Sequence, residues 1–429
     1  MDFILTLLSI ISFWEVGYLT NFYFLHKKQI NLSSFFGLGL GIVGLMQILL
    51  GLAQIKLQQS LVLTFFILTT LWVLLLYKKK QKKIKLTLKL DAKKLIPILS
   101  LAVFILFISY LSLLSNVWGY DAYSIWLARA RAFWLDGSVS RFNLYFFWPF
   151  DHPILWPLSI SWIYFFLGKA NEYYSQVLVL SIWIAIILIF LQQIKLKKIH
   201  SILWFSILLT TPFLYGNVIW NEYVGNADLL ASFFLLLAIS QIIKKNFLHS
   251  VLFLFFTTIS KNDLLPASLL FLVLTPLVYR KDFFQEKITA WLALLLFIIG
   301  NFTWKAYYQF DNRYINNALH LELLNRDLKD SLIYSLHAFR EEWRQLYRWG
   351  LGWWLILYGF IIGFKEILSS KEYRLCFLIL LGQLISYLIV YYLTPEDQAT
   401  NISTSIYRLS LQIYPSVLYL GYKLIETKK

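Results

Sequence analysis

The sequence has 429 residues, of which 59% are hydrophobic and only 14% are charged, whereas a soluble domain usually carries about 25% charged residues. This composition excludes an ordinary soluble protein and predicts a membrane protein. The net charge of +16 would suit nucleic-acid binding, but the basic residues are placed as in a membrane protein, as described below, and we expect no nucleic-acid partner.

Apolar runs of about 20 residues, the length that spans a bilayer, recur along the chain. The first run has no basic n-region and no small-residue cleavage site, so we expect a retained helix and not a signal peptide. The pattern predicts an all-α polytopic membrane protein with about thirteen transmembrane helices. The expected spans are 2–25, 33–53, 59–77, 95–115, 174–194, 199–214, 225–243, 247–260, 264–279, 287–306, 349–368, 373–393 and 405–424.

The basic residues divide the segments between these spans into two sides. Positive residues favour cytoplasmic loops, and segment 78–94 alone contains nine lysines. Alternating outward from this segment places 25 of the 39 Lys and Arg residues in inner segments. The pattern predicts an outer N-terminus and an inner C-terminus, with the lipid bilayer as a partner of the basic residues.

Three segments predicted to lie outside are too long to be simple turns, residues 116–173, the shorter 215–224 and 307–348. Within the first, 121–136 has the pattern of an amphipathic helix in the membrane interface. Residues 151–167 predict a second such helix, with prolines near its start, where helices tolerate them. The other long segment is expected to cover a site or to receive an acceptor. The predicted organisation is three spans and a basic loop in 1–94, a core in 95–306, an outer segment in 307–348 and C-terminal spans in 349–429.

Polar groups are costly near the membrane, so each one at an outer helix end is a candidate for function. Acids beside a lysine and an arginine suit a site that binds an anion and moves a proton. The predicted topology places these residues on the outer side: Asp121, Asp151, His152, Glu222, Asp228, Lys261, Asn262, Asp263 and Arg408.

Several of these candidates also have a structural explanation. Asp121 could cap the helix that follows it, because an aspartate there satisfies free N–H groups. Lys261 and Asp263 could pair with each other, and residues 151–152 could form a turn. Arg408 could extend to the outer headgroups.

Five stretches follow one another in the chain: "GYDAYSIWLARARAFW", "FDHPILWPLSISWIY", "WNEYVGNADLLASFF", "ISKNDLLPASLL" and "SIYRLSLQIYP". Their order along the chain, and their predicted position on the same side of the membrane, resemble the GT-C superfamily of integral-membrane glycosyltransferases. This superfamily includes protein O-mannosyltransferases and the bacterial enzymes that add sugars to lipid A. The first two stretches resemble the family's large first outer loop with its interfacial helices. The family often has a second acid beside the first, whereas Ala122 follows Asp121 here.

The resemblance implies a glycosyltransferase of the plasma (inner) membrane that uses a polyprenyl-phosphate-linked sugar on the extracytoplasmic side, in cell-envelope glycoconjugate synthesis. Asp121 is then the expected catalytic base, which takes the proton of the acceptor hydroxyl. Lys261 and Arg408 are the expected phosphate-binding residues. The acceptor (a glycolipid, a polysaccharide or a protein) and a divalent metal cofactor both stay open, and the candidates to bind either one are Asp228, Glu222, Asp263 and His152.

Two other classes of protein fit part of the pattern. A lipid or polysaccharide transporter or flippase would also have many helices, but transporters place their sites near the middle of the membrane. A membrane polysaccharide polymerase or ligase would also use lipid-linked sugars outside. The position of the polar residues at outer helix ends favours the glycosyltransferase.

Overall fold

The computed structural model of the protein is helical throughout the part of the chain that it describes, with no strand in that part. It forms two compact units: unit 1 comprises 1–143, 157–199 and 216–225, and unit 2 comprises 144–156, 200–215 and 226–429. The structure describes residues 1–25, 32–79, 92–115, 119–140, 152–192, 199–220, 223–279, 292, 295–296, 304–307, 327–394 and 397–427.

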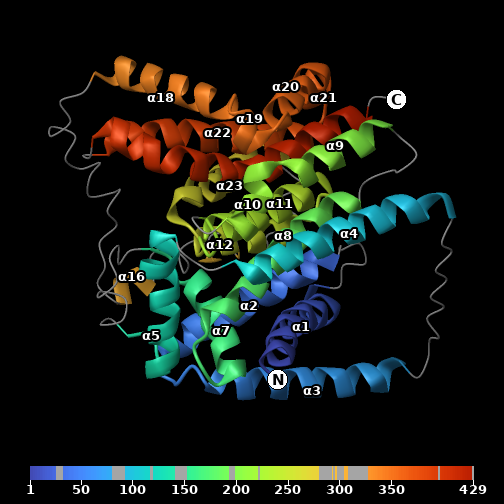
Figure 1. Ribbon diagram of the computed structural model, residues 1–429, viewed down its shortest axis with the longest axis vertical. Helices are drawn as coiled ribbons and strands as arrows, with labels where there is room; N and C mark the ends of the chain where they lie inside the picture. Colours follow the sequence, from blue (N-terminus) through green and yellow to red (C-terminus); the bar gives the residue numbers. More distant parts are fainter. Residues whose placement is uncertain are drawn as a thin grey trace. The chain divides into compact units, whose positions relative to one another are not determined.

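Unit 1 is built around two N-terminal helices that lie side by side, α1 and α2 (Figure 1). Glycines permit this close approach, because a Cβ atom on Gly39 of α2 would lie 1.6 Å from the backbone oxygen of Phe13 in α1. Small residues at such contacts are typical of helix packing in membranes. The helices of this unit are α1 (Asp2–Thr20), η1 (Asn21–Leu25), α2 (Leu32–Leu52), α3 (Gln59–Lys79), α4 (Ala92–Leu114), η2 (Ala122–Leu127), α5 (Ala128–Asp136), most of α7 (Leu155–Leu167) and α8 (Glu172–Leu191).

The expected helix at 121–136 is present as η2 and α5. It ends at Gly137, whose φ of 61° places it in the left-handed region that often closes a helix. Its burial differs from the expectation for an interfacial helix, because Trp126 and Arg129 are fully buried while Tyr120 and Tyr123 are exposed. Only part of this segment is therefore available to the membrane surface.

The expected helix at 151–167 is also present, as α7, but it does not lie on the surface. Its residues are buried on all sides, including Leu155, Ile160 and Trp162. The sequence is apolar all round in this stretch, and such a helix buries its whole circumference. The prediction of an amphipathic interfacial helix at these residues was wrong.

Unit 2 surrounds α11 (Asp228–Ile243), in which every residue from Asp228 to Ile242 is buried. α12 and α23 pack directly against α11, and α22 packs against α13, α18 and α23. Gly359 of α20 permits another close approach, since a Cβ atom there would lie 3.1 Å from the Cα of Gly421 in α23. The other helices are α9 (Ile199–Thr210), α10 (Pro212–Ile219), α12 (Phe247–Thr258), η3 (Asn262–Leu264), α13 (Leu265–Tyr279), α16 (Trp304–Tyr307), α18 (Leu328–Trp343), α19 (Leu346–Trp349), α20 (Gly352–Ile362), α21 (Phe364–Ser369), α22 (Lys371–Leu393) and α23 (Gln398–Thr427).

Among the described residues, six helices are long and apolar enough to cross a membrane. This finding supports a helical membrane protein, while about thirteen spans stay a prediction. The six are Asp2–Tyr23, Leu32–Leu52, Glu172–Leu191, His200–Ile219, Asn262–Tyr279 and Lys371–Leu393.

The predicted sidedness can be tested with single cysteines in a Cys376→Ser background. Cys376 is fully buried, so its replacement removes the natural thiol without altering the surface. We expect a membrane-impermeant thiol reagent to label Asp136→Cys in intact cells, because exposed Asp136 ends α5, which lies in a segment predicted to be outside. Lys83→Cys, which falls outside the described residues, should be labelled only after permeabilisation. The reverse pattern would overturn the topology.

Candidate functional site

One group of charged candidates comes from the turn between α12 and α13. α12 ends at Thr258, and Lys261 is extended, with φ −151° and ψ 130°. Pro266 lies in the first turn of α13. The backbone N–H groups of a first turn have no acceptor within the helix, so the missing N–H of proline costs no helical hydrogen bond. The local sequence therefore breaks the helix for a few residues and places Lys261 and Asp263 at the helix ends.

A second acid and a second base come from α11 and α23. Asp228 is the first residue of α11, and it is only 1% exposed. An acid in the first turn of a helix is stabilised by the positive end of the helix dipole. Arg408 and Gln412 are four residues apart on α23, so they share the face of that helix that packs on α11.

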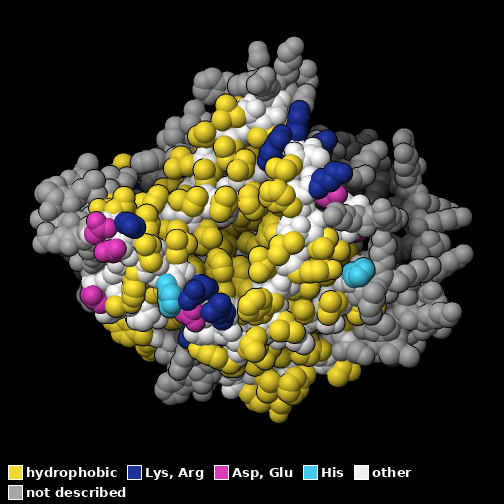
Figure 2. Space-filling view, turned by 90° about the horizontal axis from the view of Figure 1, so that it is seen from above, with side chains coloured by type: hydrophobic (Ala, Val, Ile, Leu, Met, Phe, Trp, Pro, Cys, Tyr) yellow, Lys and Arg dark blue, Asp and Glu magenta, His cyan; other side chains and the backbone are white. Residues whose placement is uncertain are grey.

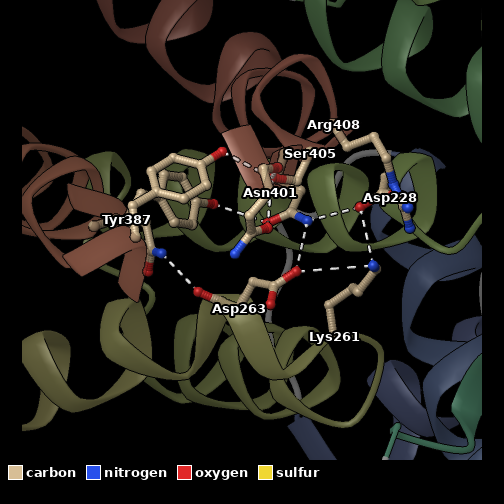
Figure 3. A network of polar contacts seen from close by, with 10 residues as sticks. Asp228, Lys261, Asp263, Tyr387, Asn401, Ser405 and Arg408 are labelled. Carbon is tan, nitrogen blue, oxygen red and sulfur yellow. Dashed lines mark hydrogen bonds and ion pairs between the residues drawn. The ribbon is translucent and has the colours of Figure 1, made fainter. Parts of the chain in front are cut away.

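These side chains converge on the Asp228 carboxylate, as Figure 3 shows. The Oδ2 atom of Asp228 accepts a hydrogen bond of 3.0 Å from Nε of Arg408, and Oδ1 accepts one of 2.7 Å from Nε2 of Gln412. Nζ of Lys261 lies 3.3 Å from Oδ1 of Asp228 and 3.8 Å from Oδ2 of Asp263. We call Asp228, Lys261, Asp263, Arg408 and Gln412 the charged cluster.

Uncharged side chains fix the geometry of the charged cluster. Gln412 receives a hydrogen bond of 2.8 Å from the hydroxyl of Tyr387 on its Oε1 atom. Its Nε2 also contacts Oδ2 of Asp263 at 3.2 Å. Gln383 of α22 donates to the Asp263 backbone oxygen at 2.7 Å and accepts from the Ala267 N–H at 2.8 Å. The turn that carries Lys261 is therefore held at both ends.

A third cation lies beside this turn. Nζ of Lys305, in α16, donates a hydrogen bond of 3.0 Å to Oδ1 of Asn262, and Lys305 is 5% exposed. Among the described residues, three cations and two carboxylates therefore gather at this turn, at the start of α11 and at the third turn of α23. Lys305 was not among the predicted site residues, because residues 287–306 were predicted as an ordinary span.

The remaining predicted site residues are placed as follows. Asp121 belongs to unit 1 and is half-buried. Within the described residues its side chain accepts no capping hydrogen bond, although it directly precedes η2. His152 belongs to unit 2 and is half-buried, just before α7. Asp151 and Glu222 lie outside the described residues.

A buried carboxylate that the sequence analysis missed lies in the predicted outer segment 307–348. Glu342 of α18 is 3% exposed. It accepts hydrogen bonds from Nη1 of Arg348 at 2.6 Å and from Nε1 of Trp349 at 2.9 Å. These two hydrogen bonds fix the end of α18 against α19. A buried carboxylate needs such partners to be stable.

The described residues contain no group of three or more His, Cys, Asp and Glu side chains placed to hold a metal ion. At Asp228, both carboxylate oxygens already accept from nitrogen donors. A divalent cation there would have to displace Lys261 or Arg408 from this carboxylate. The donor set therefore fits an anion beside the cations better than a metal ion on the acids.

No family model matches the sequence, and no match was found among curated proteins or solved structures. The function must therefore be inferred from the chemistry of the site. Lys261 and Arg408, held by buried Asp228 and by two amides, form a preorganised group of hydrogen-bond donors. Such groups stabilise negative charge that develops during a reaction.

Proposed function

We propose that the protein is a membrane glycosyltransferase that moves a sugar from a polyprenyl-phosphate donor to an acceptor hydroxyl on the extracytoplasmic side. The observation that carries the proposal is the convergence of Lys261 and Arg408, far apart in sequence, on the buried Asp228 carboxylate. A phosphate leaving group needs cations held in advance at one place. Arginine is well suited to phosphate because its N–H groups form a planar fork.

The proposed reaction is a single displacement. The acceptor oxygen forms a bond to the anomeric carbon while the bond from that carbon to the phosphate oxygen breaks, and the electron pair leaves with the phosphate. A carboxylate takes the proton of the acceptor hydroxyl. One such step inverts the anomeric centre, because the attack comes from the face opposite the leaving group. Asp121 is the proposed base.

Asp228 is proposed to position the cations and not to react. Its carboxylate accepts from Arg408, Gln412 and Lys261 and is 1% exposed, so no face of it is open to an acceptor. Asp263 is more open, with its side chain 19% exposed. In this proposal Asp263 orients the acceptor hydroxyl.

The proposal predicts that Lys261→Ala and Arg408→Ala each weaken the binding of polyprenyl phosphate. A hydrogen bond to a charged group contributes about 1.5–3 kcal/mol, so each loss should lower affinity about tenfold or more. Affinity would be measured on the purified variants in detergent. Lys423→Ala is a matched control, because Lys423 is 12% exposed and pairs with Glu426 at 2.7 Å.

Unchanged affinity in both folded variants would contradict the phosphate role of the charged cluster. Loss of affinity in Lys423→Ala to the same extent would also contradict it, because the effect would then follow from any buried lysine. A wild-type protein that binds polyprenyl phosphate but transfers no sugar from any polyprenyl-phosphate sugar would favour a lipid transporter or flippase.

A further inference from the structure

A large apolar groove opens in unit 2, and none of its lining residues belongs to the charged cluster. Its volume is about 560 Å³, within the range of about 300–1,000 Å³ that is typical of ligand pockets. Residues of α18, α20, α22 and α23 form its wall, including Trp343, Trp353, Leu357, Phe377, Leu384 and Val417. Figure 2 shows a hollow in a hydrophobic surface with Lys and Arg side chains at its margin.

Among the described residues that line the groove, Arg340 and Arg344 are the only charged ones. They stand four residues apart on α18, so they share one face of the helix. Their side chains are 55% and 52% exposed. The groove therefore combines an apolar interior with two guanidinium groups at its edge.

One carboxylate lies between these arginines. Glu341 accepts a hydrogen bond of 3.0 Å from Nε of Arg340 and contacts Nη1 of Arg344 at 3.4 Å, and Nε2 of His337 lies 3.9 Å away. The hydrogen bond from Arg340, with the charges of Arg340 and Arg344, keeps the pKa of Glu341 below its usual range. The edge therefore has two positive charges against one negative charge, and this excess suits one anionic group.

The frame of the groove is fixed from behind. Trp343 stacks on Trp353 with ring centroids 4.3 Å apart, and its Nε1 donates to Ser410 at 3.0 Å. Gln398 of α23 donates to Ser331 and Ser335 on the buried face of α18 at 2.8 and 2.9 Å. A groove with a rigid frame does not close when it is empty, and large exposed apolar surfaces of this kind are binding sites.

We propose that this groove binds an anionic phospholipid of the surrounding bilayer, with an acyl chain in the groove and the phosphate at Arg340 and Arg344. The apolar lining matches the chain, and the excess positive charge at the edge matches a headgroup of net charge −1. The lining also continues into exposed apolar residues of α18 and α20, such as Leu336 and Trp354, which favours a ligand that comes from the bilayer. This site is separate from the charged cluster and does not depend on the proposed transferase.

Native mass spectrometry of the purified full-length protein tests the proposal directly. The detergent-solubilised protein would be titrated with phosphatidylglycerol and with phosphatidylcholine of the same acyl chains. We expect tighter binding of phosphatidylglycerol. The double variant Arg340→Ala/Arg344→Ala should weaken phosphatidylglycerol binding about tenfold or more, because each basic residue near a headgroup contributes separately.

Two further variants and two controls separate the parts of the site. Glu341→Gln should tighten phosphatidylglycerol binding, because it removes the competing carboxylate. Leu357→Trp should abolish it by filling the groove. Arg131→Ala, which removes an arginine that is 45% exposed and paired with Glu172, should leave it unchanged. Lys423→Ala should also leave it unchanged, because Lys423 pairs with Glu426 and does not line the groove. The groove can fail these tests without any effect on the proposed function, which rests on other residues.

Several results would overturn the proposal. One is that the protein binds phosphatidylglycerol and phosphatidylcholine with equal affinity. Another is that Arg131→Ala weakens phosphatidylglycerol binding as much as the double variant Arg340→Ala/Arg344→Ala does. Displacement of phosphatidylglycerol by equimolar polyprenyl phosphate would assign the groove to an isoprenoid lipid instead. A two-chain species that Leu357→Trp dissociates would assign it to a second copy of the protein.

Discussion

Replacing Asp228 with alanine should destabilise the protein by about 3–5 kcal/mol, the cost of removing one partner from a buried ion pair. The Asp228 carboxylate is 1% exposed and forms ion pairs with both Lys261 and Arg408. Without it, two cations stay in a site whose lysine side chain is only 7% exposed. The measurement is the free energy of unfolding of the purified variant in detergent.

A surface ion pair supplies the control for this experiment. Glu172 pairs with Arg131, and both side chains are partly exposed. Exposed pairs contribute about 0–1 kcal/mol, so Glu172→Ala should have a small effect. Adding Lys261→Met to Asp228→Ala removes one of the two cations and should recover about 0.5–3 kcal/mol. A loss below about 1 kcal/mol in Asp228→Ala would show that Asp228 does not stabilise these cations.

The long apolar helices in the described part of the chain could be predicted from the sequence, but their ends could not, and the amphipathic helix α18 was not predicted. The apolar run at 405–424 predicted the last helix, whereas α23 begins at Gln398. Its first turns are polar, and hydropathy does not detect them. They are helical because Asp397 accepts a hydrogen bond of 2.8 Å from the Thr400 N–H and because Gln398 contacts α18.

The predicted span at 199–214 illustrates a second limit. The structure divides it into α9, which ends at Thr210, and α10, which begins at Pro212. The residue before a proline avoids the helical conformation, and a proline is well accommodated at the first helical position. The proline was visible in the sequence, but the continuous apolar pattern obscured the break.

The charged members of the charged cluster could be selected from the sequence because a charge among apolar residues is costly. Gln412, Gln383 and Tyr387 carry no charge and were missed. Their signal was weak but present: Gln412 stands four residues after Arg408, on the same helix face, and Gln383 interrupts an apolar span. Tertiary contact, and not local pattern, determines that both amides reach the turn at Asp263.

Replacing Asp121 with asparagine should lower the turnover of sugar transfer by ~10²–10⁴, the factor typical of losing a general base. Asparagine cannot take the proton of the acceptor hydroxyl. It has nearly the same shape as aspartate, and in the described structure the Asp121 side chain makes no capping hydrogen bond to η2. Stability in detergent and the affinity for polyprenyl phosphate should therefore stay close to wild type. The assay would follow turnover with the polyprenyl-phosphate sugar that the wild-type protein uses best.

Asp136→Asn serves as the matched control. Asp136 is an exposed acid at the C-terminal end of α5, whereas Asp121 lies just before η2, which leads into α5. The Asp136→Asn variant should transfer sugar at the wild-type rate.

If Asp121→Asn also transfers sugar at the wild-type rate, Asp121 is not the base, and Asp263 becomes the next candidate. Asp263 is preferred over Asp228 because its side chain is 19% exposed, compared with 1% for Asp228. A base must reach the acceptor hydroxyl, and a carboxylate already surrounded by three nitrogen donors has little tendency to take a proton. Asp263→Asn would then be measured in the same assay. A large loss of turnover would identify Asp263 as the base, and an unchanged rate would show that the protein does not transfer sugar by this mechanism.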